Sequence, residues 1–111
     1  MNSALRRAAT ACWLGTVAVS LAGCGSAERR GEELYELHCA ECHEMPNPEL
    51  KKPPPQLEGL FHAKTLPSGA PATDAEVKKT ILQGLRTMPA FDGRLSEDDV
   101  KSLVAYLHTL K

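Results

Sequence analysis

Two cysteines and a histidine form a cluster whose spacing indicates a specific chemistry. They lie in Cys39-Ala40-Glu41-Cys42-His43, which is the C-x-x-C-H pattern of covalent haem attachment. Cysteines three residues apart on one helical turn can each form a thioether with a vinyl group of the porphyrin, while the adjacent histidine turns its imidazole toward the iron. The pattern predicts one haem c, bound covalently through Cys39 and Cys42 and ligated on one side by His43.

Two other uses of a C-x-x-C pattern are thiol exchange of the thioredoxin type and a structural zinc site. The first requires a β-α-β setting, and the chain has no such pattern. A zinc site requires four ligands, but Cys12 and Cys24 lie in the N-terminal segment. The other histidines follow no zinc-ligand spacing, and we expect them to be solvated or satisfied by neighbours: His38, His62 and His108.

A second axial ligand is predicted at Met88, 45 residues after His43. Its soft, neutral thioether favours ferrous iron, so His/Met ligation raises the reduction potential. A lone methionine more often fills a gap in a core, but Met45 lies only two residues after His43 and would be held on the same side of the ring. Two filled axial positions leave no site for a substrate, which predicts an electron carrier and not an enzyme.

Two alternative functions remain open at this point. If Met88 were displaced or labile, a five-coordinate haem would serve a gas sensor or a weak peroxidase, and carbon monoxide would then change the spectrum of the reduced protein. The domain could instead be a fixed electron-entry subunit of a larger oxidoreductase, which co-purification from detergent would reveal.

The N-terminal segment predicts export and a lipid anchor. Met1 to Arg7 carries two arginines, and Ala8 to Leu21 is an apolar run of 14 residues, too short to span a bilayer. Leu21-Ala22-Gly23-Cys24 resembles the lipobox of bacterial lipoproteins, in which the cysteine is acylated and becomes the first residue. We therefore expect Cys24 to carry the lipid.

This interpretation divides the chain into a removed signal peptide over 1–23, a linker over 24–28 and one domain over 29–111. It places the domain on the periplasmic side of a bacterial membrane, with the outer membrane slightly favoured because Gly25 is not an aspartate. The alternative is a soluble periplasmic protein cut after a small residue such as Ala27.

The remaining charge excludes one class of partner. Losing the two arginines of the signal lowers Lys+Arg from 13 to 11 against 14 acidic residues, which gives a formal net charge of −3. No basic stripe is left to release counterions from phosphates, so nucleic acid is not an expected partner.

The rest of the sequence predicts helices joined by a long loop. An amphipathic helix is expected over 29–40, and seven prolines exclude a long helix from 44–72. Thr73 begins a second helix in a capping-box pattern, and Gly84 ends it. Ser96 caps a third helix, whose apolar stripe is Val100, Leu103, Val104, Leu107 and Leu110.

From Gly31 to Leu110 the sequence resembles a class I cytochrome c. In that family a glycine and an aromatic residue lie eight and four residues before the first haem cysteine, as Gly31 and Tyr35 do here. The final helix, with Leu103-Val104-Ala105-Tyr106-Leu107, is similar to the family's closing motif. The resemblance implies an all-α fold of short helices and a proline-rich loop wrapped round one haem.

The same resemblance extends to the loop after the haem motif, Pro55-Gln56-Leu57-Glu58-Gly59-Leu60-Phe61. It implies that the Pro55 carbonyl accepts the ring N–H of His43 and that Leu57 presses on the haem. The anchored carrier is expected to be a monomer, and the membrane tether raises its local concentration near its partners. The expected redox partners are membrane or periplasmic dehydrogenases, a bc-type complex, and oxidases or reductases.

Overall fold

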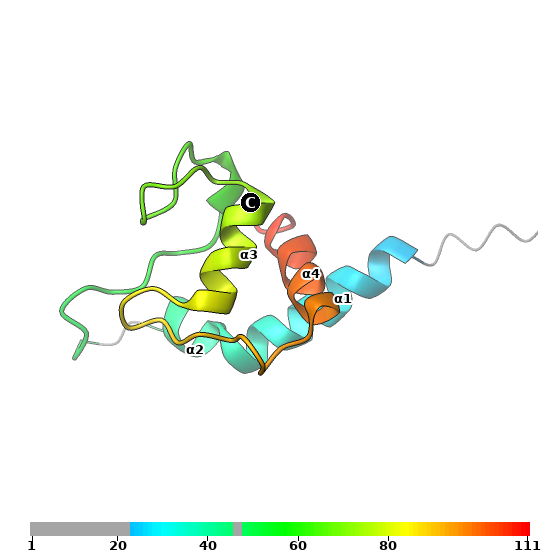
Figure 1. Cartoon of the computed structure of the whole chain (residues 1–111), viewed down its shortest axis with the longest axis horizontal. Helices are drawn as coiled ribbons and strands as arrows, with labels where there is room; N and C mark the ends of the chain where they lie inside the picture. The colour runs from blue at the N-terminus through cyan, green and yellow to red at the C-terminus, as the bar shows by residue number, and fades with distance from the viewer. Residues whose placement is uncertain (1–22, 46–47) are drawn as a thin grey trace, which may run out of the picture.

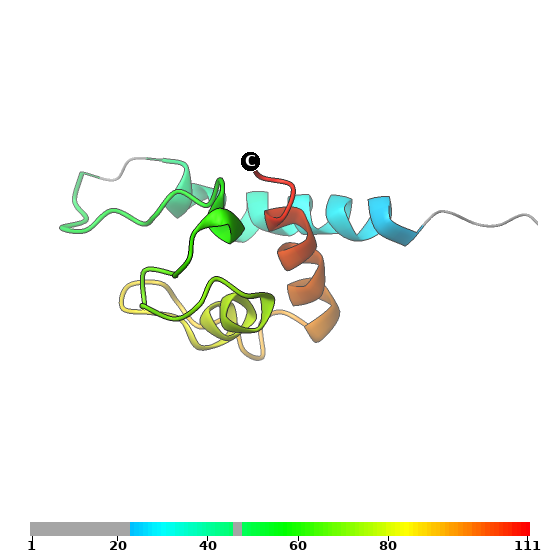
Figure 2. The same ribbon diagram turned by 90° about the horizontal axis from the view of Figure 1, so that it is seen from above.

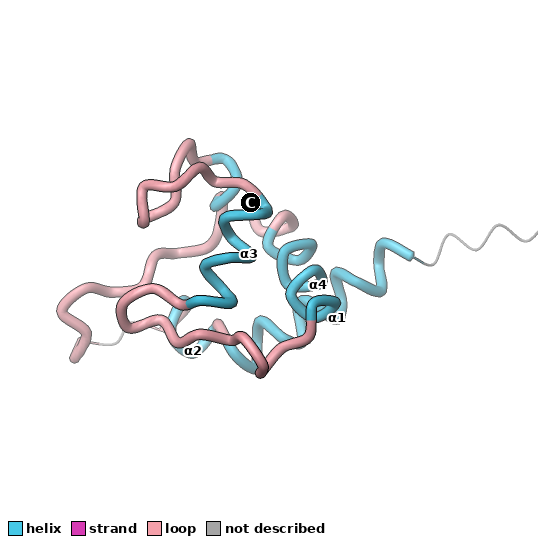
Figure 3. Tube along the Cα trace, viewed as in Figure 1, coloured by secondary structure: helices cyan, strands magenta, loops and turns pink. Residues whose placement is uncertain are grey.

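The computed structural model describes residues 23–45 and 48–111, and in these ranges the chain is helical with no strand. Figure 1 shows the helices and loops arranged in a ring, and Figure 3 shows how much of the chain is loop. Two isolated bridges, Thr65 with Pro71 and Leu85 with Met88, are the only extended pairings among the described residues. The elements are α1 Gly23–His38, α2 Ala40–His43, the 3-10 helix η1 Leu60–His62, α3 Asp74–Gln83 and α4 Glu97–Leu107.

Helix α1 is longer at its start than the sequence pattern predicted. The expected linker over 24–28 is helical, because it contains no proline to break a helix and the Arg29 Nε donates to the Gly25 carbonyl at 3.5 Å. The helix also ends earlier than expected, at His38, and Cys39 joins it to α2. The signal segment over 1–22 lies outside the described residues, and no described helix is long and apolar enough to cross a membrane.

Helices α1 and α4 form the main packing contact of the domain. Figures 1 and 2 show them crossing at a steep angle. Gly31 lies at the crossing, where a Cβ would stand 2.0 Å from the Ser102 carbonyl oxygen and 2.7 Å from the Tyr106 Cβ. Tyr35 packs one turn further along, with its ring centroid 5.2 Å from that of Tyr106. The expected roles of Gly31 and Tyr35 at the final helix are therefore present.

Gly31→Ala is expected to destabilise the domain by about 2–4 kcal/mol, because the clash is with backbone and no rotamer change relieves it. Urea denaturation of the haem-loaded protein, followed by circular dichroism, measures the loss. Gly25→Ala is the matched control, since it lies in the same helix and its new Cβ would meet no other atom within 4 Å. A Gly31→Ala protein as stable as Gly25→Ala would show that the helices do not cross this closely.

The core is made by α1, α3 and α4 together with two loop residues. Every predicted stripe residue within α4 is buried, whereas Leu110 lies beyond the helix end and is half-buried. The loops close over this core from both sides, because Leu66 and Phe91 are buried as well. The buried apolar side chains are Leu34, Tyr35, Leu66, Val77, Ile81, Phe91, Val100, Leu103, Val104 and Leu107.

The N-terminus of α4 is held by a reciprocal capping box that also reaches α1. Ser96 Oγ accepts the Asp99 N–H at 3.0 Å, and Asp99 Oδ2 accepts the Ser96 N–H at 3.2 Å. Arg30 of α1 donates from Nε and Nη2 to Asp99 Oδ1 at 3.2 and 3.1 Å. The hydrogen bonds to Ser96, with help from Arg30, hold the pKa of Asp99 below its ordinary value of 3.8.

The lowered pKa of Asp99 makes the contribution of the α4 N-terminus to stability dependent on pH. The contribution of its carboxylate is complete above pH 3.8 and disappears as the pH falls through the lowered folded-state pKa. Asp99→Asn is therefore expected to lower the melting temperature at pH 7. At a pH below the folded-state pKa of Asp99, the variant and wild type should have the same melting temperature. Asp98→Asn, with a side chain 93% exposed in the same turn, is the control. An Asp99→Asn effect that persists at the lowest pH would contradict this origin.

The predicted loop over 44–72 contains one short helix that the proline-rich sequence did not predict. Leu60–His62 forms η1, entered through Gly59, whose N–H donates to the Leu110 carbonyl at 3.2 Å. The loop after the haem motif is thereby tied to the C-terminal end of the chain. Thr73 then caps α3 by accepting the Glu76 N–H at 3.4 Å, as predicted.

Candidate cofactor site

A cavity of about 340 Å³ lies between α2, the proline-rich loop, α3 and the segment that follows α3. Its wall is mostly apolar, as expected of a site that takes a large flat cofactor. The apolar lining includes Leu50, Leu57, Leu60, Leu66, Val77, Ile81, Leu85, Met88 and Phe91. All six residues that the sequence predicts at the haem lie on this wall: Cys39, Cys42, His43, Pro55, Leu57 and Met88.

Both cysteines of the C-x-x-C-H motif line this cavity with free thiols. Cys39 lies between α1 and α2 and is half-buried, and Cys42 is exposed within α2. Burial, with a smaller effect of Cys42, raises the pKa of the Cys39 thiol to about 11. Thiol exchange uses a cysteine of lowered pKa, so this environment is the opposite of a thioredoxin-type site.

His43 ends α2 and lines the same cavity. Its Nδ1 lies 2.7 Å from the Pro55 carbonyl oxygen, which can only accept a hydrogen bond. The proton is therefore on Nδ1, and Nε2 carries the free lone pair that a metal requires. The hydrogen bond implied by the family resemblance is present.

Met88 reaches the cavity through a tight turn after α3. The Leu85 and Met88 backbones exchange two hydrogen bonds, of 3.1 and 2.9 Å. Gly84 has a φ of 73°, and a Cβ there would stand 2.5 Å from the Met88 carbonyl oxygen, so the turn requires a glycine. Figure 2 shows α2 and the segment after α3 on separate levels of the molecule. Met45, by contrast, is 65% exposed and is not on the cavity wall.

Sequence reasoning gave His38 no part in the site, but this residue lines the cavity. Its ring meets that of Phe91 edge-on at a centroid distance of 5.8 Å, and Arg94 lies over the same Phe91 ring at 4.9 Å. The position of His38 directly before Cys39 was the available signal. His62 and His108 are not on the wall, and His108 is satisfied by stacking on Phe61 and by Asp74 at 2.7 Å.

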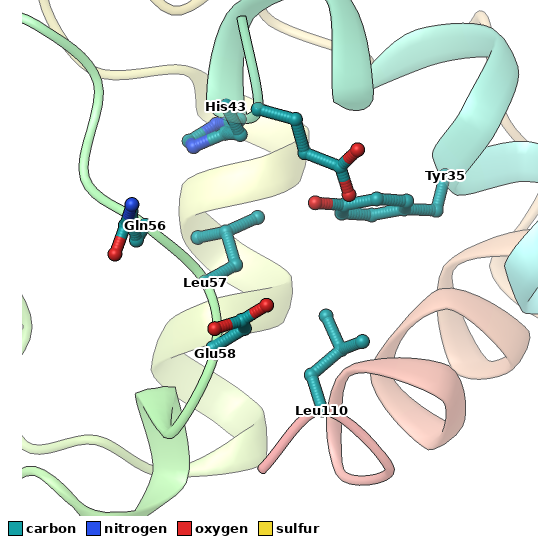
Figure 4. Close-up of a pocket in the computed structure, with 7 residues that line it drawn as sticks. Tyr35, His43, Gln56, Leu57, Glu58 and Leu110 are labelled. Atoms are coloured by element: carbon teal, nitrogen blue, oxygen red, sulfur yellow. The ribbon is translucent and has the colours of Figure 1, made fainter.

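A second cavity of about 310 Å³ borders the first and shares His43 and Leu57 with it. Figure 4 shows the Leu57 side chain between those of His43, Tyr35 and Leu110, with the Glu58 carboxylate beside them. Glu44 and Gln56 complete the lining. His43 therefore lines both the main cavity and a smaller, more polar one.

The chain matches known proteins over the part that forms these cavities. The family model described as cytochrome c oxidase, cbb3-type, subunit III matches residues 26–107. The chain belongs to this family of c-type cytochromes. Cytochrome c6 of the diatom Phaeodactylum tricornutum has the same fold, with a TM-score of 0.59 and 28% identity over 74% of this chain and 91% of that one. It is a class I cytochrome of the predicted all-α type.

Two curated relatives show how different the lengths of similar proteins are. The cytochrome bc1 complex cytochrome c subunit of Corynebacterium diphtheriae is 32% identical over 83 residues, covering 74% of this chain but 27% of that protein. Cytochrome c6 of Diacronema lutheri is 26% identical, covering 69% of this chain and 88% of that protein. The present cytochrome thus spans about a quarter of the length of the bc1 subunits that it matches.

Membership of this family establishes the class of cofactor. Class I cytochromes bind one haem c covalently. The residues on the cavity wall fit that group, because an apolar wall, two free thiols and a histidine with a free Nε2 meet in one place.

Proposed function

We propose that this cytochrome carries single electrons on a haem held by thioethers to Cys39 and Cys42, with His43 and Met88 as axial ligands. The observation that carries the proposal is that all four side chains line one apolar cavity. When bound, the haem supplies an iron that alternates between the ferric and ferrous states.

The residues of the chain have distinct tasks in this proposal. The Pro55 carbonyl fixes the tautomer and the plane of the His43 ring, so Nε2 keeps one direction in both redox states. The turn at Leu85 to Met88 fixes the backbone that presents the thioether. Leu57 and Phe91 exclude water from the wall, and a site that changes little between states suits fast electron transfer.

The ligation is tested by absorption spectra of the purified protein, oxidised and then reduced with ascorbate, with and without carbon monoxide. We expect a low-spin c-type spectrum that carbon monoxide does not change. A reduced protein that binds carbon monoxide readily would favour the five-coordinate gas sensor or weak peroxidase instead.

The proposed partners follow from the relatives. Several relatives are named as cytochrome c subunits of a bc1 complex, which supports a bc-type complex as one redox partner. Dehydrogenases of the membrane or periplasm and terminal oxidases or reductases are the other proposed partners. The coverage of 88% of cytochrome c6 supports a separate carrier, which we propose is a monomer, whereas the bc1 names support the alternative of a fixed subunit. Co-purification of a larger complex from mild detergent would select the subunit.

We also propose that the cytochrome is anchored by a lipid on Cys24, on the periplasmic side of the membrane and with the outer membrane favoured. The lipobox-like Leu21-Ala22-Gly23-Cys24 supports this. Cys24→Ser is expected to move the cytochrome out of the membrane fraction or to stop its processing, since no acyl chain can be attached. Cys12→Ser is the matched control and should stay with the membrane. A Cys24→Ser protein that is processed and still membrane-bound would refute the anchor.

A further inference from the structure

Glu44 directly follows His43, and its side chain belongs to the second cavity. Its partner there is Tyr35 of α1, which is only 2% exposed and whose hydroxyl donates a hydrogen bond to the Glu44 carboxylate. The Tyr35 ring is fixed by packing against Tyr106. A rigid, buried donor therefore restricts the direction of an exposed and otherwise flexible carboxylate.

The Tyr35 hydroxyl is protonated at neutral pH and can therefore donate to the carboxylate. Burial raises the pKa of the Tyr35 phenol far above its ordinary value of 10.0, and the hydrogen bond to Glu44 and the charge of that carboxylate raise it further. A neutral phenol beside an ionised carboxylate is a charge-assisted pair, which is stronger than a hydrogen bond between neutral groups.

The charge of Glu44 is not cancelled within the cavity that it lines. The described residues of that wall are Tyr35, His43, Glu44, Gln56, Leu57, Glu58 and Leu110. No lysine or arginine is among them, and Glu58 adds a second acidic side chain. Negative charge therefore lies on the wall that His43 shares with the second cavity, and Glu44 is close enough to act on His43 although its side chain is exposed.

We propose that Tyr35 holds the Glu44 carboxylate beside His43 so that its negative charge stabilises the ferric over the ferrous haem and lowers the reduction potential. Reduction adds one electron to the ferric centre and removes one positive charge there, so the attraction to Glu44 is greater before reduction than after it. Tyr35 acts through Glu44 and is a positioning residue. This inference rests on the proposed ligation of the haem by His43.

The test is the midpoint potential of the haem-loaded protein, measured by spectroelectrochemistry at low ionic strength. Glu44→Gln is expected to raise the ferrous-to-ferric ratio on the order of fivefold at a fixed electrode potential, as removing one nearby charge would. Tyr35→Phe keeps the packing but frees the carboxylate, so it should give a smaller rise. Because the freed carboxylate is solvated, added salt should affect Tyr35→Phe more than wild type.

The double variant Tyr35→Phe with Glu44→Gln separates positioning from packing. If Tyr35 acts only through Glu44, the double variant has the potential of Glu44→Gln alone. Glu36→Gln is the matched control, because it removes one exposed negative charge next to Tyr35 in the sequence without removing the pair.

Two results would overturn the inference while leaving the proposed function intact. One is a Glu44→Gln potential no higher than that of Glu36→Gln, and the other is strictly additive effects in the double variant. A wild-type protein without a low-spin, histidine-ligated haem would overturn the proposed function itself, and the spectrum reveals this before any potential is measured.

Discussion

Met88→Ala is expected to leave the haem covalently attached but to open its sixth coordination position. The reduced variant should then bind carbon monoxide, which we do not expect of wild type. Because a thioether favours ferrous iron, its loss should also lower the reduction potential, by on the order of 0.1–0.3 V within the roughly 0.8 V range that axial ligands span. Absorption spectra with and without carbon monoxide, and a redox titration, measure both effects.

Met45→Ala is the matched control for this experiment, because Met45 is exposed and absent from the cavity wall. It should keep the wild-type spectrum and potential. The opposite pattern, with Met45→Ala responsive to carbon monoxide and Met88→Ala unchanged, would show that Met45 is the sixth ligand. An equal response of wild type and Met88→Ala would mean that the sixth position is open already.

The turn that carries Met88 is fixed by backbone contacts. Arg86 has a φ of 55°, which is unfavourable for a residue with a Cβ. The turn therefore depends on its two backbone hydrogen bonds and on Gly84. Its position is fixed further by the Phe91 N–H, which donates to the Ile81 carbonyl of α3 at 3.1 Å. The backbone of the proposed ligand is thus tied to α3 and does not lie in a free loop.

Helices α3 and α4 could be predicted from the sequence because their signals are local. Thr73 and Ser96 mark their starts through hydrogen bonds to residues three positions later, and apolar spacing marks their buried faces. The predicted start of α1 was wrong by six residues, because a short segment without proline favours neither linker nor helix. The 3-10 helix at Leu60–His62 was missed because the hydrogen bond that ties it to Leu110 joins residues far apart in the sequence.

The residues of the candidate site also differ in whether the sequence alone predicts them. The motif cysteines, His43 and Met88 could be predicted because their chemistry restricts their type and spacing. The wall could not be, since any apolar residue serves and its members come together only when distant segments fold. Leu66 and Phe91 belong to loops whose courses no local pattern determines. The pairing of Tyr35 with Glu44 was missed for the same reason, because eight residues and the end of α1 separate them.

Replacing both motif cysteines, Cys39→Ser with Cys42→Ser, is expected to abolish covalent haem attachment and to unfold most of the domain. Serine forms no thioether, so denaturing electrophoresis with haem staining should show no band. Without haem, the apolar wall of this cavity of about 340 Å³ is left to water, and its burial against the cofactor no longer stabilises the fold. A domain of this size has a total stability of only about 4–12 kcal/mol, so circular dichroism should show a large loss of helix.

The single variants show that the two effects have separate causes. Cys39→Ser and Cys42→Ser each keep one thioether, so haem staining should persist, and with it most of the helix content, because the cavity is still filled. Cys24→Ser controls for loss of a cysteine outside the motif and should stain like wild type in the fraction where it is found. Haem that survives denaturation of the double variant would place the covalent attachment at another residue. A double variant that stays fully helical without haem would show that the core of α1, α3 and α4 is stable by itself. The cofactor would then not be required for the stability of the fold.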